Sequence, residues 1–132
     1  MRVLRLRKVW LAVGWFAVCI LIYESLTPSP PSLPEFPLAD KLTHFLVYTL
    51  IMLWFGFVYS PGKKYSLLGL SLILLGVILE LLQGAGGNRS MEVSDASANA
   101  LGVLVGGLLA ATRLSSALLW VERLIYSREH RA

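Results

Sequence analysis

The chain alternates between long apolar runs and short polar connections. Four runs are long enough to cross a bilayer, whose hydrocarbon core of about 30 Å needs about 20 apolar residues in a helix. They cover residues 9–26, 39–59, 65–83 and 93–112. The first run follows basic residues, as in a signal peptide, but it is long and no small-x-small cleavage site follows it. We therefore expect an all-α, polytopic four-helix transmembrane bundle that retains its first span.

The residues after the last run have a different pattern. Within 113–132, apolar residues recur at helical spacing on one face, at Leu114, Leu118, Val121 and Ile125. Basic residues flank this face, and Trp120 suits the headgroup layer of a membrane. We expect two parts: a four-span membrane domain over 1–112 and a basic amphipathic tail over 113–132. The tail would form a C-terminal helix on the cytoplasmic surface, with a partner-binding helix as the alternative.

Composition supports a membrane protein. Of the 132 residues, 56% are hydrophobic and 15% are charged, and the mean hydropathy is +0.67. Soluble domains carry about 25% charged residues. The net charge of +4 comes from basic residues beside the apolar runs, which favours a membrane surface over nucleic acid. The lone Cys19 excludes an intrachain disulfide and a thiolate metal cluster.

The basic residues also predict an orientation. They are concentrated in the N-terminal arm, in the loop holding Lys63 and Lys64, and in the tail. The loop between the first two spans is acidic, with Glu35 and Asp40 against Lys41. Because Lys and Arg favour the cytoplasmic side, both termini should face the cytoplasm. The segment 27–37 is rich in proline and should form a semi-rigid external connection.

With this orientation, the polar residues of three spans lie at one membrane face. The second span enters from outside, so Asp40, Lys41, His44 and Tyr48 are at its outer end. The third and fourth spans bring further polar residues to the same face: Glu80, Gln83, Asp95 and Asn99. An ionisable residue at the centre of a span costs about 2.5–3.5 kcal/mol and less near the interface. Several such residues together indicate a polar pocket that opens outward.

Spacing places these residues on common helix faces. Asp40, His44 and Tyr48 follow each other at four-residue intervals and form one ridge. On the fourth span, Gly102 and Gly106 continue the ridge of the polar residues with a small-xxx-small pattern. This pattern lets a neighbouring helix approach closely.

The order of these blocks resembles a known family. DKLTHFLVY (40–48), ELLQ (80–83), Arg89 in a Gly-rich loop and the D-x-x-x-N-x-x-G pattern in VSDASANALGVLVGG (93–107) are similar to the VanZ-like family of small bacterial membrane proteins. The resemblance covers 25–107. It implies a cell-envelope role in the bacterial cytoplasmic (inner) membrane. The family's namesake is associated with low-level resistance to the glycopeptide teicoplanin, without an agreed reaction.

The side chains of the pocket fit a phosphate-bearing ligand. Lys41 and Arg89 could hold a phosphate, and His44, oriented by Asp40 or Glu80, could act as general acid or base. The remaining candidate ligand-binding residues are Tyr48, Gln83, Asp95 and Asn99. We expect the partner to be a membrane lipid or a lipid-linked envelope precursor. Whether a reaction follows stays open. The sequence shows no Ser–His or Cys–His pairing that would indicate a covalent nucleophile.

Two alternatives use the same residues. A metal ion could bind at His44, Asp40, Glu80 and Asp95, although zinc sites usually recruit more His or Cys; the sequence favours no cofactor. In the structural alternative the chain is a non-catalytic accessory factor in envelope assembly or glycopeptide resistance. The polar residues would then join the helices, with Asp40 and Asp95 capping their helices and Lys41 extending to the headgroups.

Overall fold

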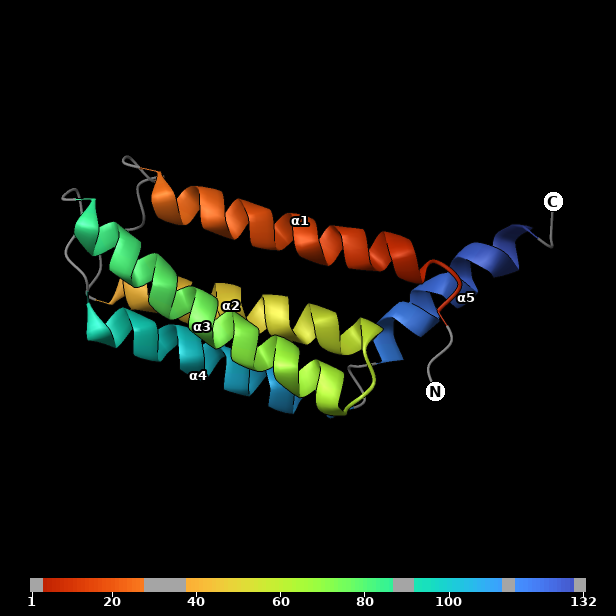
Figure 1. Cartoon of the computed structure of the whole chain (residues 1–132). Coiled ribbons are helices and arrows are strands. Elements are labelled where there is room, and N and C mark those ends of the chain that lie inside the picture. The colour runs from red at the N-terminus through yellow and green to blue at the C-terminus, as the bar shows by residue number, and fades with distance from the viewer. Residues whose placement is uncertain (1–3, 28–37, 87–91, 113–115, 130–132) are drawn as a thin grey trace.

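The computed structural model in Figure 1 is all-helical, as the sequence predicts, and describes residues 4–27, 38–86, 92–112 and 116–129. Its helices are α1 (Arg7–Leu26), α2 (Ala39–Val58), α3 (Lys63–Ala85), α4 (Val93–Ala110) and α5 (Ala117–Glu129). The proline-rich connection, Arg89 and Leu114 lie outside the described residues. Predictions made for them stay predictions.

Helices α1 to α4 are each long and apolar enough to cross a membrane. Their ends differ from the predicted spans by one or two residues. Helix α1 begins at Arg7 instead of residue 9, and α3 extends two residues beyond the predicted span at both ends. The difference arises because the prediction followed apolarity, whereas Lys63 and Lys64 are good helix formers that continue the hydrogen-bonded turns. The coarse prediction of a multi-pass membrane protein is supported.

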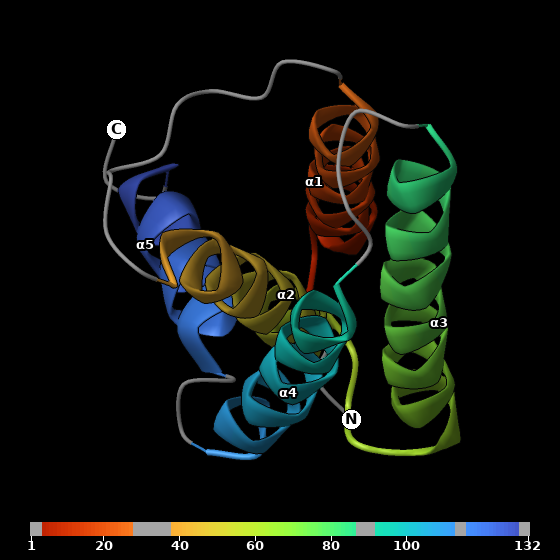
Figure 2. The same cartoon turned by 90° about the vertical axis from the view of Figure 1, so that its left-hand side faces the viewer.

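The four long helices run side by side, and successive helices point in opposite directions (Figure 1). Helix α2 occupies the middle of the bundle and contacts α1, α3, α4 and α5 (Figure 2). Its closest partner is α4, along which it packs for most of its length. The start of α2, the end of α3 and the start of α4 therefore meet at one end of the bundle, which is the end on the left of Figure 1.

Two glycines allow α4 to approach α2 this closely. A Cβ at Gly102 would collide with the carbonyl oxygen of Phe45, and a Cβ at Gly106 would lie 2.5 Å from that of Thr49. The obstacles are backbone atoms of α2, which cannot rotate away as a side chain can. The predicted small-xxx-small packing face is thus confirmed, and its partner is α2.

The outer surface of the bundle is apolar. Large hydrophobic side chains on all four long helices are exposed: Phe16, Leu50, Leu67, Leu104 and Leu108. A soluble protein rarely exposes so continuous an apolar surface. Lipid is the solvent that suits these faces.

Helix α5 packs against the end of α2 and the residues just before α1 instead of standing apart. Leu118 is buried with Leu4 and Val58, and Glu122 is buried beside them. On the predicted apolar face, Val121 is half-buried. A helix is present where the tail predicted one, while its position on a membrane surface is not tested by this packing.

Candidate functional site

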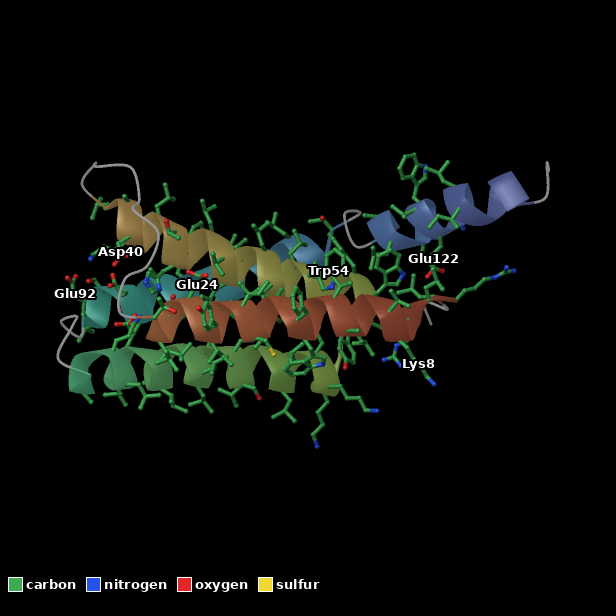
Figure 3. All side chains as sticks on the ribbon, turned by 90° about the horizontal axis from the view of Figure 1, so that it is seen from above. Lys8, Glu24, Asp40, Trp54, Glu92 and Glu122 are labelled. Atoms are coloured by element: carbon green, nitrogen blue, oxygen red, sulfur yellow. The ribbon has the colours of Figure 1, made fainter. Side chains whose placement is uncertain are left out.

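Most of the polar residues singled out in the sequence meet at the end of the bundle formed by α2, α3 and α4. Figure 3 shows Asp40 and Glu92 there, and Lys8 and Glu122 toward the opposite end. Helix geometry explains the gathering, because the antiparallel order brings the first turns of α2 and α4 beside the last turns of α3. We call the group Asp40, Lys41, His44, Glu80, Glu92, Asp95 and Asn99 the polar cluster.

His44 lies at the centre of the polar cluster. Its Nδ1 is 3.0 Å from Asn99 Oδ1 on α4 and 3.9 Å from Glu80 Oε1 on α3. Its Nε2 is 3.7 Å from Asp40 Oδ1, one turn earlier on α2. The contact to Asn99 is a hydrogen bond when Nδ1 carries the proton, since Oδ1 is an acceptor. The neutral ring then has its acceptor lone pair on Nε2, on the side of Asp40.

Lys41 bridges α2 to the start of α4. Its Nζ lies 2.6 Å from Glu92 Oε2 and 3.0 Å from Asp95 Oδ1. Its ammonium group is therefore paired twice within the protein. The hydrogen bond from Lys41 holds the pKa of the Glu92 carboxyl below its usual range, and the hydroxyl of Ser94 adds to this effect.

The inner side of the polar cluster is closed to solvent. Glu80 and Asn99 are each 2% exposed and Asp95 is 5% exposed. Tyr48 is 1% exposed, and its ring belongs to the hydrophobic core of the bundle. Its hydroxyl and Asn99 both approach Gly76 on α3, where a Cβ would lie 3.1 Å from each. Tyr48 thus forms the floor of the polar cluster.

Gln83 lies at the same end of the bundle but forms its hydrogen bond outside the polar cluster. Its Nε2 donates a hydrogen bond of 2.6 Å to the backbone oxygen of Ser25, which ties the end of α3 to the end of α1. A role for Gln83 in ligand binding would require this bond to open. Arg89 lies outside the described residues, and with it the predicted phosphate contact.

Neither predicted helix cap is formed. The N-cap of α2 is Leu38 and that of α4 is Glu92, and neither helix has a side-chain capping hydrogen bond. Asp40 and Asp95 instead lie within the first turns, where a carboxylate still interacts favourably with the helix dipole. The capping alternative for these two residues is wrong, because their side chains point into the polar cluster.

Three of the four candidate metal ligands lie close together. One ligand atom from each of Asp40, His44 and Asp95 lies within 4.8 Å of the others. Glu80, the fourth candidate, is not part of this group. Glu80 Oε1 lies 3.9 Å from Nδ1 of His44, the nitrogen that also contacts Asn99.

Two acidic residues with specific contacts were missed in the sequence. Glu92 is exposed and pairs with Lys41; its position directly before α4, three residues from Asp95, was the available signal. Glu122 accepts hydrogen bonds from the backbone N–H groups of Arg5 and Leu6 and from Trp10 Nε1, at 2.8–2.9 Å. Its signal in the sequence was its position: Glu122 lies four residues after Leu118, on the apolar face of a basic tail.

No family model, no curated protein and no solved structure matches the chain.

Proposed function

We propose that this chain is a VanZ-like integral membrane protein of the bacterial cell envelope that binds or processes a lipid-linked, phosphate-bearing precursor at the polar cluster. The observation that carries the proposal is the position of His44, which is held by buried Asn99 on one nitrogen and faces Asp40 with the other. A polar network at one end of an apolar bundle is a costly feature in a membrane and by default suggests a functional site.

The residues of the polar cluster divide into roles. Asn99 fixes the ring of His44, so the Nε2 lone pair faces Asp40 and is available for interaction with the bound ligand. On ligand binding, the ion pair of Lys41 with the exposed Glu92 would open. The ammonium group would then bind a phosphate oxygen of the ligand. Arg89 would supply a second cation from the neighbouring loop, and the apolar faces below would take the lipid chains.

The proposed orientation puts the polar cluster at the outer leaflet of the cytoplasmic membrane. Support comes from the exposed basic residues at the opposite end: Arg5, Arg7, Lys8, Lys63, Lys64 and Arg123. Such residues favour the cytoplasmic side. Helix α5, with Trp120 exposed, would then lie at the inner surface.

Native mass spectrometry of the chain purified with its own lipids tests this proposal. We expect an adduct whose mass corresponds to a phosphate-bearing lipid. The adduct should disappear in His44→Gln, Lys41→Gln and Arg89→Ala, and persist in Lys64→Gln, which removes an exposed lysine at the other end of the bundle. Absence of any such adduct from the wild-type protein would overturn the proposal.

One observation favours a second candidate, a non-catalytic accessory factor in envelope assembly or glycopeptide resistance. Within the described residues, no buried side-chain nitrogen or oxygen is without a hydrogen-bond partner, so the polar cluster can serve as interhelical contacts alone. Thermal unfolding of the same variants separates the two. If the adduct is lost only in proportion to folded protein, the structural role is favoured; if it is lost at unchanged stability, ligand binding is favoured.

A further inference from the structure

The charge of the polar cluster raises a difficulty for a phosphate ligand. The polar cluster holds four carboxyl groups and one ammonium group: Glu92 and Asp95 pair with Lys41, and Asp40 and Glu80 lie beside His44. When these carboxyls are ionised and His44 is neutral, the described part of the cluster is negative. An approaching phosphate would therefore be repelled at short range.

From this charge and from the geometry around His44, we infer that Asp40, His44 and Asp95 bind a divalent cation of the Mg²⁺ or Mn²⁺ class. The inference builds on the proposed function, because the ion would join the phosphate of the lipid-linked ligand to the carboxylates of the protein. Mg²⁺ commonly binds through one or two carboxylates together with substrate phosphates and waters.

Distances within the cluster suit such an ion. Atoms bound to one ion at about 2.1 Å lie about 3 Å apart in cis and about 4.2 Å apart in trans. The ligand atoms of Asp40, His44 and Asp95 lie within 4.8 Å of one another, with His44 Nε2 3.7 Å from Asp40 Oδ1. Shifts of less than an ångström would close the set around an ion.

The second nitrogen of His44 supplies an independent argument. A metal-binding histidine almost always donates its other ring N–H to a carboxylate or carbonyl oxygen, which fixes the ring and its tautomer. Nδ1 of His44 has that environment, with Asn99 Oδ1 at 3.0 Å and Glu80 Oε1 at 3.9 Å, both on residues that are 2% exposed. The ring is thus oriented so that Nε2 faces Asp40.

The donor set selects the class of ion. The two carboxylates favour a hard ion of the Mg²⁺ or Mn²⁺ class, and the imidazole makes Mn²⁺ the better fit of the two, whereas structural zinc usually recruits more His or Cys. Lys41 does not block the site, because it uses Oδ1 of Asp95 and a carboxylate has a second oxygen for an ion.

Mn²⁺ titration of the full-length chain in nanodiscs, followed by electron paramagnetic resonance, tests the inference. We expect one saturable Mn²⁺ per chain, displaced by Mg²⁺. Asp40→Asn and His44→Gln should each weaken binding by at least the roughly 10- to 100-fold effect known for loss of a supporting group. Glu24→Gln is the matched control, since Glu24 is a half-buried carboxyl on α1 toward the same end (Figure 3) and should leave binding unchanged.

The outcomes separate the cation from the proposed function. Failure of wild-type protein to bind Mn²⁺, or equal binding by wild type and both ligand variants, overturns the cation site. A phosphate-lipid adduct that persists in EDTA also overturns the bridging role and leaves the proposed function intact. Stoichiometric Mn²⁺ without any lipid adduct supports the cation site and removes the proposed function.

Discussion

His44 and Asn99 face each other across the α2–α4 interface, with Nδ1 of the imidazole 3.0 Å from Oδ1 of the amide. The two residues are 55 positions apart in the chain, and each lies on a ridge that is visible in the sequence. Their contact joins the central helix of the bundle to its closest partner. It also decides which nitrogen of His44 is available for chemistry.

This contact should be measurable as a coupling free energy. A double-mutant cycle of His44→Ala and Asn99→Ala, followed by unfolding in detergent or bicelles, should give about 0.6 kcal/mol and at most about 1.7 kcal/mol, the range for polar contacts between membrane helices. The cycle of His44→Ala and Ser97→Ala is the control, because the Ser97 hydroxyl is exposed and donates to Val93 O within α4. Equal coupling in both cycles would contradict the contact.

The glycine face of α4 predicts a contrast between two neighbouring residues. Gly106→Ala should destabilise the bundle by about 1–3 kcal/mol, as overpacking does, because its Cβ would lie 2.5 Å from Thr49 O. Gly107→Ala should be neutral or slightly stabilising, since the nearest atom, Met52 Cε, would be 3.8 Å away and alanine favours a helix. Thermal unfolding of both variants is the measurement, and similar losses in the two would refute the proposed packing.

The ion pair of Lys41 and Glu92 predicts a dependence of stability on pH. The folded pKa of Glu92 is lowered by Lys41, so the stabilisation is present above the ordinary carboxyl pKa, near 4.5, and is lost as the pH falls through the lowered folded value. Glu92→Gln should reduce the loss of thermal stability between neutral pH and pH below about 4. An unchanged pH profile in Glu92→Gln would show that other carboxyls account for the acid sensitivity.

Glu122 is expected to hold α5 against the start of α1. Burial by itself would raise the pKa of Glu122, but the hydrogen bonds from Leu6, Trp10 and Arg5 outweigh it and lower the pKa. Glu122→Ala leaves three donors without this acceptor and should destabilise the docked helix by about 1.5–3 kcal/mol, the value of a hydrogen bond to a charged group.

Hydrogen exchange of α5 is the measurement for Glu122. Protection of Ala117–Glu129 should fall in Glu122→Ala and stay near wild type in Arg123→Gln, which changes an exposed neighbour on the same helix. Equal protection in the two variants would mean that Leu118 and its apolar contacts hold α5 without help from the carboxylate.

The sequence by itself determined the helices and their polar ends. Apolar runs of about 20 residues identify membrane spans because the hydrocarbon core has a fixed thickness. Within it the backbone N–H and C=O groups must hydrogen-bond to each other, as they do in a helix. Spacing of three and four residues placed Asp40 with His44 on one ridge and Gly102 with Gly106 on another, since helix periodicity is a local property of the chain. These features needed no knowledge of which helix meets which.

The tertiary structure decided the partners. The structural alternative had Lys41 extending outward and Asp95 capping its helix, whereas the packing of α2 on α4 pairs the two at 3.0 Å. Likewise, only the docking of α5 on α1 turns Glu122 from a tail residue into a buried acceptor. The reason is physical: the rotation of each helix about its axis, and therefore the group that its polar ridge meets, is set by side-chain and glycine packing between distant segments.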